Sequence, residues 1–219
     1  MTYDLIIVTQ SSPDLIQMTQ DCIDSALADT KDINVIIVES GQPYKYRRVN
    51  KFLEYNGAFN YNRALNLGLK YAKGDVRILA NNDLVFKPGW SKIGELMQLN
   101  DYHSASARAG HQTMIDVGDF VYVGYTIGVT LNGWCIFMDK YCHEQIGTLD
   151  ETCTFWYSDN LYGCQLSAAG IKHVLFCNCQ VDHLASRTLT KQTGKIKNQY
   201  KTGEVSKFII RRKYYAEIK

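Results

Sequence analysis

The 219-residue chain lacks several features that would assign it to a class at once. No apolar run approaches the roughly 20 residues that a membrane-spanning helix needs. The first residues carry neither a basic segment nor a small-residue cleavage site, so we expect a strand there rather than a signal peptide. With 16 glycines, three prolines and 46% hydrophobic residues, the composition excludes a collagen-like, low-complexity or disordered chain.

Common metal and nucleotide motifs are also missing. The seven cysteines are scattered, and because no Cys-x-x-Cys pair occurs, we expect no structural zinc site. An odd, dispersed set of cysteines favours free thiols in a reducing compartment, and we therefore expect a cytoplasmic protein. Neither Gly-x-Gly-x-x-Gly nor Gly-x-x-x-x-Gly-Lys-Ser/Thr occurs, which excludes a Rossmann dinucleotide loop and a P-loop.

The small net charge of +2 conceals an uneven distribution along the chain. Residues 184–219 contain ten Lys or Arg and two Glu, a net charge of +8, whereas the preceding 183 residues carry −6. The length predicts one domain with an appendage, since a domain takes roughly 150 residues. We therefore expect an acidic body followed by a basic arm.

The hydrophobic pattern predicts an α/β fold with a mostly parallel central sheet flanked by helices. Short β-branched runs are typical of strands that are buried on both faces, and they alternate with apolar residues at helical spacing. Ser12 is the predicted cap of the first helix, and Gly74 and Gly170 are predicted to end two later helices. The predicted strands are 4–8, 34–38, 76–80 and 173–177, the predicted helices are 13–27, 60–73, 90–99, 158–169 and 204–218, and 101–132 is predicted to form loops and irregular strands.

Polar residues follow three of the predicted strands, at the edge where open α/β sheets bind ligands. They are Thr9, Glu39 and the run Asn81-Asn82-Asp83. Each alone is a common turn or cap residue, but their convergence at one edge predicts a nucleotide pocket. Glu39 offers acceptors for a pyrimidine ring and a ribose, and Asp83 is an oxygen ligand of the kind that a hard divalent cation on a diphosphate requires.

The residues that follow Phe59 resemble the family 2 glycosyltransferases of the GT-A fold. The family pattern N-x-G-(x)3-A-x-G-D is similar to Asn66-Leu-Gly-Leu-Lys-Tyr-Ala-Lys-Gly-Asp75, and its L-N-N-D motif is similar to Ala80-Asn81-Asn82-Asp83. The resemblance covers about residues 3–186 in the family's order. Its later parts are Gly133-Trp134-Cys135 for the acceptor-side loop, Gly147-Thr-Leu-Asp150-Glu151 for G-G-F-D-E, Tyr157-Ser158-Asp159-Asn160-Leu161 for the E-D-x-D helix start, and Val181-Asp182-His183 for V-x-H.

This resemblance implies a GT-A domain over residues 1–186 and a basic arm over 187–219, with an amphipathic helix packed on or beside the domain. It implies that Asp159 is the general base of an inverting transfer. It also implies that Asp83 and His183 hold Mn²⁺ or Mg²⁺, which neutralises charge on the leaving diphosphate. The remaining implied roles are donor binding by Thr9, Glu39, Asn66, Asn81, Asn82 and Asp83, and contact with the acceptor by Gly133 and Trp134.

The chain departs from the family pattern at several positions. Asn81 stands where the pattern has its first Asp, which leaves one carboxylate for the metal, and Glu39 replaces the usual Asp. Ser158 and Leu161 replace the acids that flank Asp159. Structural alternatives stay open for the site residues, namely Asp159 as a helix cap, His183 as a structural histidine and Trp134 as a core residue, with Asp75 and Asp150 interpreted as turn and capping residues.

The implied activity is hexosyl or pentosyl transfer from a nucleotide donor, expected to be a UDP-sugar, to a glycan or a lipid-linked saccharide. Two alternatives remain, glycosylation of a hydroxymethylated DNA base and a non-catalytic nucleotide-sugar binding module. The basic arm suits either a peripheral membrane contact or a phosphate backbone. An apolar stripe predicts that its helix also packs, through Val205, Phe208, Ile209, Tyr215 and Ile218.

Overall fold

The computed structural model describes residues 1–112, 120–184 and 194–218. The predicted boundary between residues 186 and 187 therefore lies outside the described residues. The strands are β1 Tyr3–Thr9, β2 Ile33–Glu39, β3 Lys51–Glu54, β4 Val76–Ala80, β5 Leu84–Phe86, β6 Ser104–Arg108, β7 Val121–Val123, β8 Cys135–Asp139 and β9 His173–His183. The helices are α1 Pro13–Ala26, α2 Tyr61–Leu69, α3 Lys92–Leu99, α4 Lys140–Ile146, α5 Ser158–Ala168 and α7 Gly194–Glu217.

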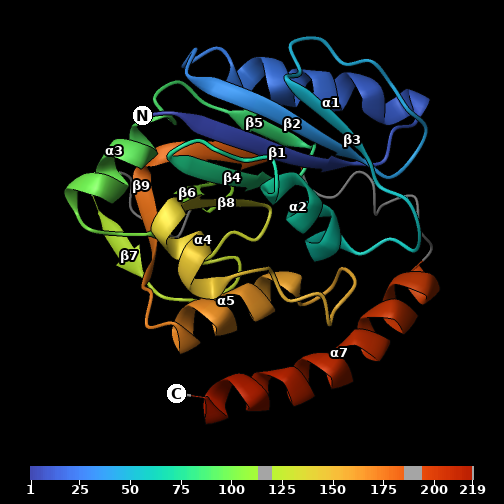
Figure 1. Cartoon of the computed structure of the whole chain (residues 1–219), viewed down its shortest axis with the longest axis vertical. Helices are drawn as coiled ribbons and strands as arrows, with labels where there is room; N and C mark the ends of the chain where they lie inside the picture. The colour runs from blue at the N-terminus through green and yellow to red at the C-terminus, as the bar shows by residue number, and fades with distance from the viewer. Residues whose placement is uncertain (113–119, 185–193, 219) are drawn as a thin grey trace.

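The strands form one mixed sheet in the order β3-β2-β1-β4-β8-β6-β9-β5, with β7 paired to β9 (Figure 1). The first four strands of this order are parallel, and β1 pairs with β2 in register from Tyr3 opposite Ile33 to Thr9 opposite Glu39. Beyond β4, the pairs β4–β8, β6–β8, β5–β9 and β7–β9 are antiparallel, and β6–β9 is parallel. The predicted α/β class is confirmed. The parallel part of the sheet consists largely of the strands from the N-terminal part of the chain, β1 to β4.

Helices cover both faces of the sheet (Figure 1), because successive residues of the central strands point to opposite sides. On β1, Leu5 and Ile7 join a core with α1 and α3, while Ile6 and Val8 join a second core with α2, α4 and α5. The β-branched runs that predicted the strands are therefore buried on both faces, as such runs require.

Several predicted element ends differ from the structure. The second helix ends at Leu69 rather than at residue 73, and Gly74 does not cap it. Instead, the N–H groups of Lys73 and Gly74 both donate to the carboxylate of Asp4, which holds this turn against the start of β1. Ser12 occupies the N-cap position of α1, but its side chain forms no capping hydrogen bond.

The strand predicted over 173–177 extends to His183 because it changes partners along its length. Its first part pairs with β6, the register shifts after Ala107, and its last residues pair with β5, where His183 lies opposite Leu84. His183 is thus on a strand rather than in the loop after one. This pairing places it beside the turn that joins β4 to β5.

Helix α7 packs against α5, on the side away from the sheet (Figure 1). Its predicted apolar stripe is partly wrong, because Ile209 and Ile218 are 49% and 53% exposed. The buried side mixes charged and aromatic residues, and its members are Glu204, Phe208, Arg211 and Tyr215. Among the described residues, no helix is both long and apolar enough to cross a bilayer.

A buried histidine gives the fold a pH-dependent stability. His173 is fully buried between the hydroxyls of Ser104, 2.7 Å from Nδ1, and Ser106, 3.0 Å from Nε2. Burial lowers the pKa of His173 to about 3. In the unfolded chain the histidine pKa is about 6.5, so as the pH falls the unfolded state takes up this proton before the folded state does. The contribution of His173 to the free energy of unfolding is therefore fully present above pH 6.5 and declines toward pH 3.

We expect the free energy of unfolding to fall by about 2 kcal/mol between pH 6.5 and pH 5 through His173 alone, at about 1.4 kcal/mol per pH unit. Urea unfolding at several pH values measures the total slope, and His173→Gln should reduce it by the contribution of His173, while that of His143, whose pKa burial also lowers, stays. His111→Gln, at an exposed position, is the control that keeps the total slope. An unchanged slope in His173→Gln would contradict the assignment.

Candidate active site

The side-chain amides of Asn81 and Asn82 hold the turn between β4 and β5 to β1, α1 and α2. The side-chain nitrogen of Asn82 donates to the hydroxyl of Thr9 at 3.1 Å and to that of Thr19 at 3.0 Å. The side-chain oxygen of Asn81 accepts a hydrogen bond from the hydroxyl of Tyr61 at 2.8 Å. These contacts leave Asp83 at the end of the turn, where its side chain faces β9.

Asp83 and His183 form a pair of potential metal ligands. The Oδ1 atom of Asp83 lies 3.1 Å from Nε2 of His183, and both side chains are largely buried, at 4% and 14% exposure. Nε2 forms no hydrogen bond with any described residue. A carboxylate oxygen and an imidazole nitrogen at this separation fit two ligands of one small divalent cation, whose bonds to each are about 2.0–2.2 Å.

Substrate phosphates and water can supply the remaining ligands of such a cation. The described part of the chain contains no group of three or more His, Cys, Asp or Glu side chains placed to hold a metal. Mg²⁺ commonly binds to one or two carboxylates together with substrate phosphates and water. The Asp83–His183 pair fits that mode of binding.

Asp159 lies in the first turn of α5 rather than at its cap. The N-cap residue is Tyr157, whose φ is 66°, so the interpretation of Asp159 as a helix cap is wrong. The Asp159 carboxylate accepts a hydrogen bond from the N–H of Asn160 at 2.8 Å. Burial nevertheless raises the pKa of this carboxyl above its ordinary value, which makes it a stronger proton acceptor.

Two consecutive residues contact this carboxylate and the Asp83–His183 pair. The Asp159 side chain lies against the backbone of Gly133, where a Cβ atom would overlap it, so only glycine fits there without a shift. The next residue, Trp134, stacks on His183 with ring centroids 5.4 Å apart and planes 15° apart. Gly133 therefore contacts Asp159, and its neighbour Trp134 contacts His183.

Tyr61 marks the same site from the side of α2. Its hydroxyl contacts Asn81, and its pKa is raised by burial first and then by the nearby Cys135, Asp83 and Asp159. The sequence pattern did not identify this residue as part of the site. Its position at the start of an asparagine-rich helix, immediately after Asn60, was the signal that could have found it.

Glu39 and Thr9 lie at adjacent strand ends, as predicted, but their polar atoms have protein partners. The Glu39 carboxylate is buried and accepts hydrogen bonds from the N–H groups of Ser11 at 2.8 Å and Gly41 at 2.6 Å, and from the Ser11 hydroxyl. Tyr46 contacts the same hydroxyl at 2.6 Å. The carboxylate thus shapes the loop beside the strand ends, and direct contact with a nucleotide stays a prediction.

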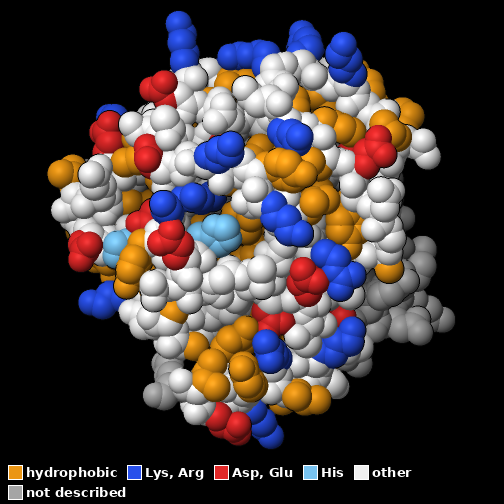
Figure 2. All heavy atoms as spheres, viewed as in Figure 1, with side chains coloured by type: hydrophobic (Ala, Val, Ile, Leu, Met, Phe, Trp, Pro, Cys, Tyr) orange, Lys and Arg blue, Asp and Glu red, His pale blue; other side chains and the backbone are white. Residues whose placement is uncertain are grey.

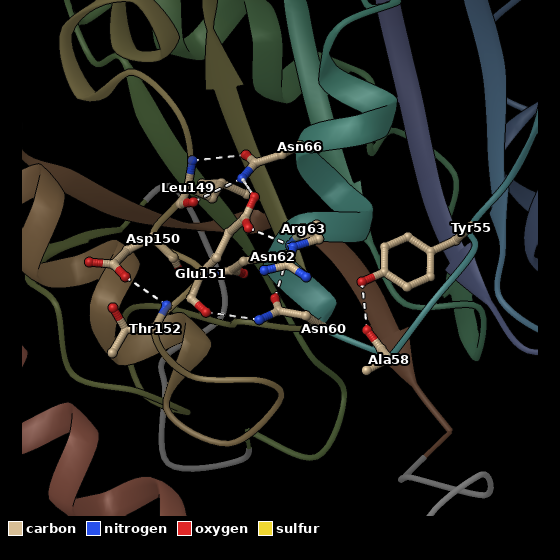
Figure 3. A network of polar contacts seen from close by, with 10 residues as sticks. All are labelled: Tyr55, Ala58, Asn60, Asn62, Arg63, Asn66, Leu149, Asp150, Glu151 and Thr152. Carbon is tan, nitrogen blue, oxygen red and sulfur yellow. Dashed lines mark hydrogen bonds and ion pairs between the residues drawn. The ribbon is translucent and has the colours of Figure 1, made fainter.

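Asn66 joins α2 to the segment that precedes α5 (Figure 3). Its amide nitrogen donates to the backbone oxygen of Leu149 and to Glu151, and its oxygen accepts the Leu149 N–H at 2.8 Å. Asn60 and Asn62 donate to the backbone oxygens of Glu151 and Asp150. The structure therefore gives Asn66 a clear role in holding this segment, and donor binding by Asn66 stays a prediction.

Asp150, interpreted from the sequence as a turn residue, also anchors the C-terminal helix. It accepts the N–H of Thr152 at 2.8 Å, as a turn residue does. Its other oxygen contacts Arg211 and accepts a hydrogen bond from Tyr215 at 2.8 Å. No feature near Asp150 in the sequence points to residues so far along the chain.

Comparison with known proteins identifies the family. The sequence model described as glycosyl transferase family 2 matches residues 4–156. The chain belongs to this family. No curated protein matches the chain.

Among solved structures, the chain is similar to the crystal structure of GalNAc-T7 with UDP, GalNAc and Mn²⁺, with a TM-score of 0.66 and 10% identity. The match covers 83% of this chain and 43% of that one, so this chain spans less than half of the GalNAc-T7 chain. This likeness confirms the GT-A fold. Because the family match ends at residue 156, roles for Asp159 and His183 depend on the geometry described above.

Proposed function

We propose that this glycosyltransferase moves a hexosyl or pentosyl group from a UDP-sugar to a hydroxyl of a glycan or lipid-linked saccharide, with inversion at the anomeric carbon. The observation that carries the proposal is a pair of contacts made by consecutive residues. Gly133 contacts Asp159, and Trp134 stacks on His183, which lies beside Asp83. We therefore assign a proton acceptor and a place for a diphosphate-bound cation to one site, as sugar transfer requires.

On the donor side, we assign the nucleotide to the ends of β1 and β2, beside Thr9 and Glu39, and the diphosphate to the turn at Asn81-Asn82-Asp83. Asp83 and His183 would hold Mn²⁺ or Mg²⁺, which when bound stabilises negative charge on the departing diphosphate. The UDP and Mn²⁺ in the GalNAc-T7 structure support this choice of nucleotide and metal. The free Nε2 of His183 supports it independently.

On the acceptor side, we assign Asp159 as the general base. The acceptor oxygen attacks the anomeric carbon as its proton passes to the carboxylate, and the bond from that carbon to the diphosphate oxygen breaks on the opposite face. The raised pKa of Asp159 supports this role, because a more basic carboxylate accepts a proton more readily. Gly133 leaves room for the carboxylate, and Trp134 offers an aromatic face beside His183.

Two basic side chains of α7 are paired within the protein, whereas Arg212 and Lys213 are exposed. Among the side chains described in this helix, Lys207 pairs with Glu204 at 3.0 Å and Arg211 pairs with Asp150. On the face shown in Figure 2, acidic side chains are interspersed with basic ones rather than separated from a basic stripe. The scattered cysteines support a reducing, cytoplasmic location for the enzyme.

The proposal is tested by donor turnover. The full chain is incubated with Mn²⁺ and a panel of UDP-, GDP- and dTDP-sugars, and release of the nucleoside diphosphate is measured with and without a saccharide acceptor. We expect slow release from a UDP-sugar alone and faster release with the correct acceptor, whose product carries the inverted linkage. Nucleotide binding without turnover of any donor would instead support a binding module.

A further inference from the structure

We propose that helix α7 positions the general base of this enzyme, acting through Glu204 and Arg211 on residues 150–157, the segment that leads into α5. The inference rests on the proposed function for the role that it gives Asp159. The segment itself carries no metal ligand and no base. Its importance is that it ends two residues before Asp159, so its conformation determines where α5 begins.

The first part of the segment is held by α2 (Figure 3). Asn60 and Asn62 donate to the backbone oxygens of Glu151 and Asp150, and Arg63 forms an ion pair with Glu151 at 2.7 Å. The side-chain contacts drawn from α2 all fall on residues 149–151. Beyond residue 151, α2 contributes the N–H of Tyr61, which donates to the backbone oxygen of Thr154.

The second part of the segment is held by Glu204 of α7. The carboxylate accepts hydrogen bonds from two consecutive backbone N–H groups, those of Thr154 and Phe155, and its other oxygen pairs with Lys207 at 3.0 Å. The Glu204 side chain is only 6% exposed. A carboxylate buried to this extent is costly unless it is fully bonded, so the two N–H groups specify where the segment must lie.

Three further residues of α7 contact the two ends of the segment. Arg211 and Tyr215 both bind the carboxylate of Asp150 at the start of the segment. Phe208 stacks on Tyr157 at its end, with ring centroids 5.1 Å apart and planes 8° apart. Tyr157 has a φ of 66°, a conformation that is unfavourable for a bulky residue and persists only when its surroundings impose it.

The position of a reacting carboxylate matters greatly, since a misplacement of about 1 Å can cost on the order of 100-fold in rate. The contacts of α7 fall on residues 150–157 and on α5, which carry the base, whereas the Asp83–His183 pair lies on β5's turn and β9. Loss of these contacts should therefore lower kcat while leaving the KM for the donor unchanged.

The chain offers matched pairs of substitutions on one helix. Glu204→Ala removes the buried acceptor of two N–H groups, and Glu217→Ala makes the same change at an exposed position. Arg211→Gln breaks the pair with Asp150, and Arg212→Gln is its exposed neighbour. Arg211→Lys, which keeps the charge, should restore part of the loss. All five are compared in the full chain, and none alters a residue of the site itself.

For Glu204→Ala and Arg211→Gln we expect kcat to fall by about tenfold or more, with the donor KM within about twofold of wild type. Amide hydrogen exchange of the peptide covering residues 152–158 should accelerate in both variants and stay unchanged in both controls. Binding of UDP with Mn²⁺, measured by titration calorimetry, should be unaffected in all of them.

Wild-type kcat and wild-type exchange in Glu204→Ala and Arg211→Gln would overturn the inference, as would equal losses in the exposed controls. These outcomes are separate from a failure of the proposed function. If Asp159→Asn leaves turnover unchanged, the base assignment fails; if Asp159→Asn abolishes turnover but the α7 variants do not lower it, only this inference fails. Should wild type turn over no donor, unchanged exchange of residues 152–158 would by itself overturn the positioning role.

Discussion

Replacing Asp159 with Asn should lower sugar transfer by about 10³-fold while leaving UDP binding intact, because general-base catalysis contributes about 10²–10⁴-fold. Asparagine has nearly the same shape and keeps an oxygen for the N–H of Asn160, so the fold beside Gly133 should be preserved. What it lacks is a basic oxygen that can take the acceptor's proton. The measurement is kcat for transfer, with UDP affinity determined in parallel.

The pH profile provides a second readout for the same substitution. Only the carboxylate accepts a proton, so activity is lost as the pH falls below the pKa of Asp159. Since burial raises that pKa, the acid limb of kcat/KM should lie above the value of about 3.9 for an ordinary aspartic acid. The residual activity of Asp159→Asn should lack this limb.

The control for Asp159→Asn is Asp21→Asn, the same change at an exposed position on α1. It should leave both kcat and the acid limb unchanged. Transfer by Asp159→Asn at the wild-type rate, with an unchanged acid limb, would show that another group accepts the proton.

Substitution of Asp83 or His183 should have the second largest effect on turnover. Asp83→Asn and His183→Ala should each lower Mn²⁺-dependent turnover by about 10²–10³-fold, since charge stabilisation by a metal is worth several kcal/mol and each 1.36 kcal/mol is tenfold in rate. The two side chains approach each other at 3.1 Å, and removal of either leaves one protein ligand. Both variants should also bind UDP more weakly in the presence of Mn²⁺ than wild type does.

A readout that does not depend on turnover makes this prediction sharper. Titration of Mn²⁺ in the presence of UDP, followed by water-proton relaxation, should show wild-type binding that is weakened in both variants. Asp101→Asn, whose side chain is 96% exposed, is the carboxylate control and should bind Mn²⁺ normally. Unchanged Mn²⁺ binding in both Asp83→Asn and His183→Ala would mean that any metal is held elsewhere.

Several elements of the fold were predictable because their signals are local. The β-branched runs of β1, β2 and β4 specify strands buried on both faces, and Gly170, with a φ of 70°, follows the end of α5 as predicted. The convergence of Thr9 and Glu39 followed from parallel pairing, and the structure places them opposite each other. Element ends that depend on distant partners were not predictable, as Gly74 shows by bonding to Asp4 instead of capping a helix.

By itself, the sequence determined the α/β class, the strands that form the ligand-binding edge and the candidate residues Asp83, Asp159 and His183. Hydrophobic period, turn residues and ordered motifs are properties of neighbouring residues, so they can be read along the chain. Only the tertiary structure decided that Gly133 lies against Asp159 and that His183 reaches Asp83 from a strand. It alone decided that the basic arm binds the body through Arg211 on Asp150, 61 residues away. Such contacts form between side chains that packing brings together, and no local pattern records which distant partner a charged residue will meet.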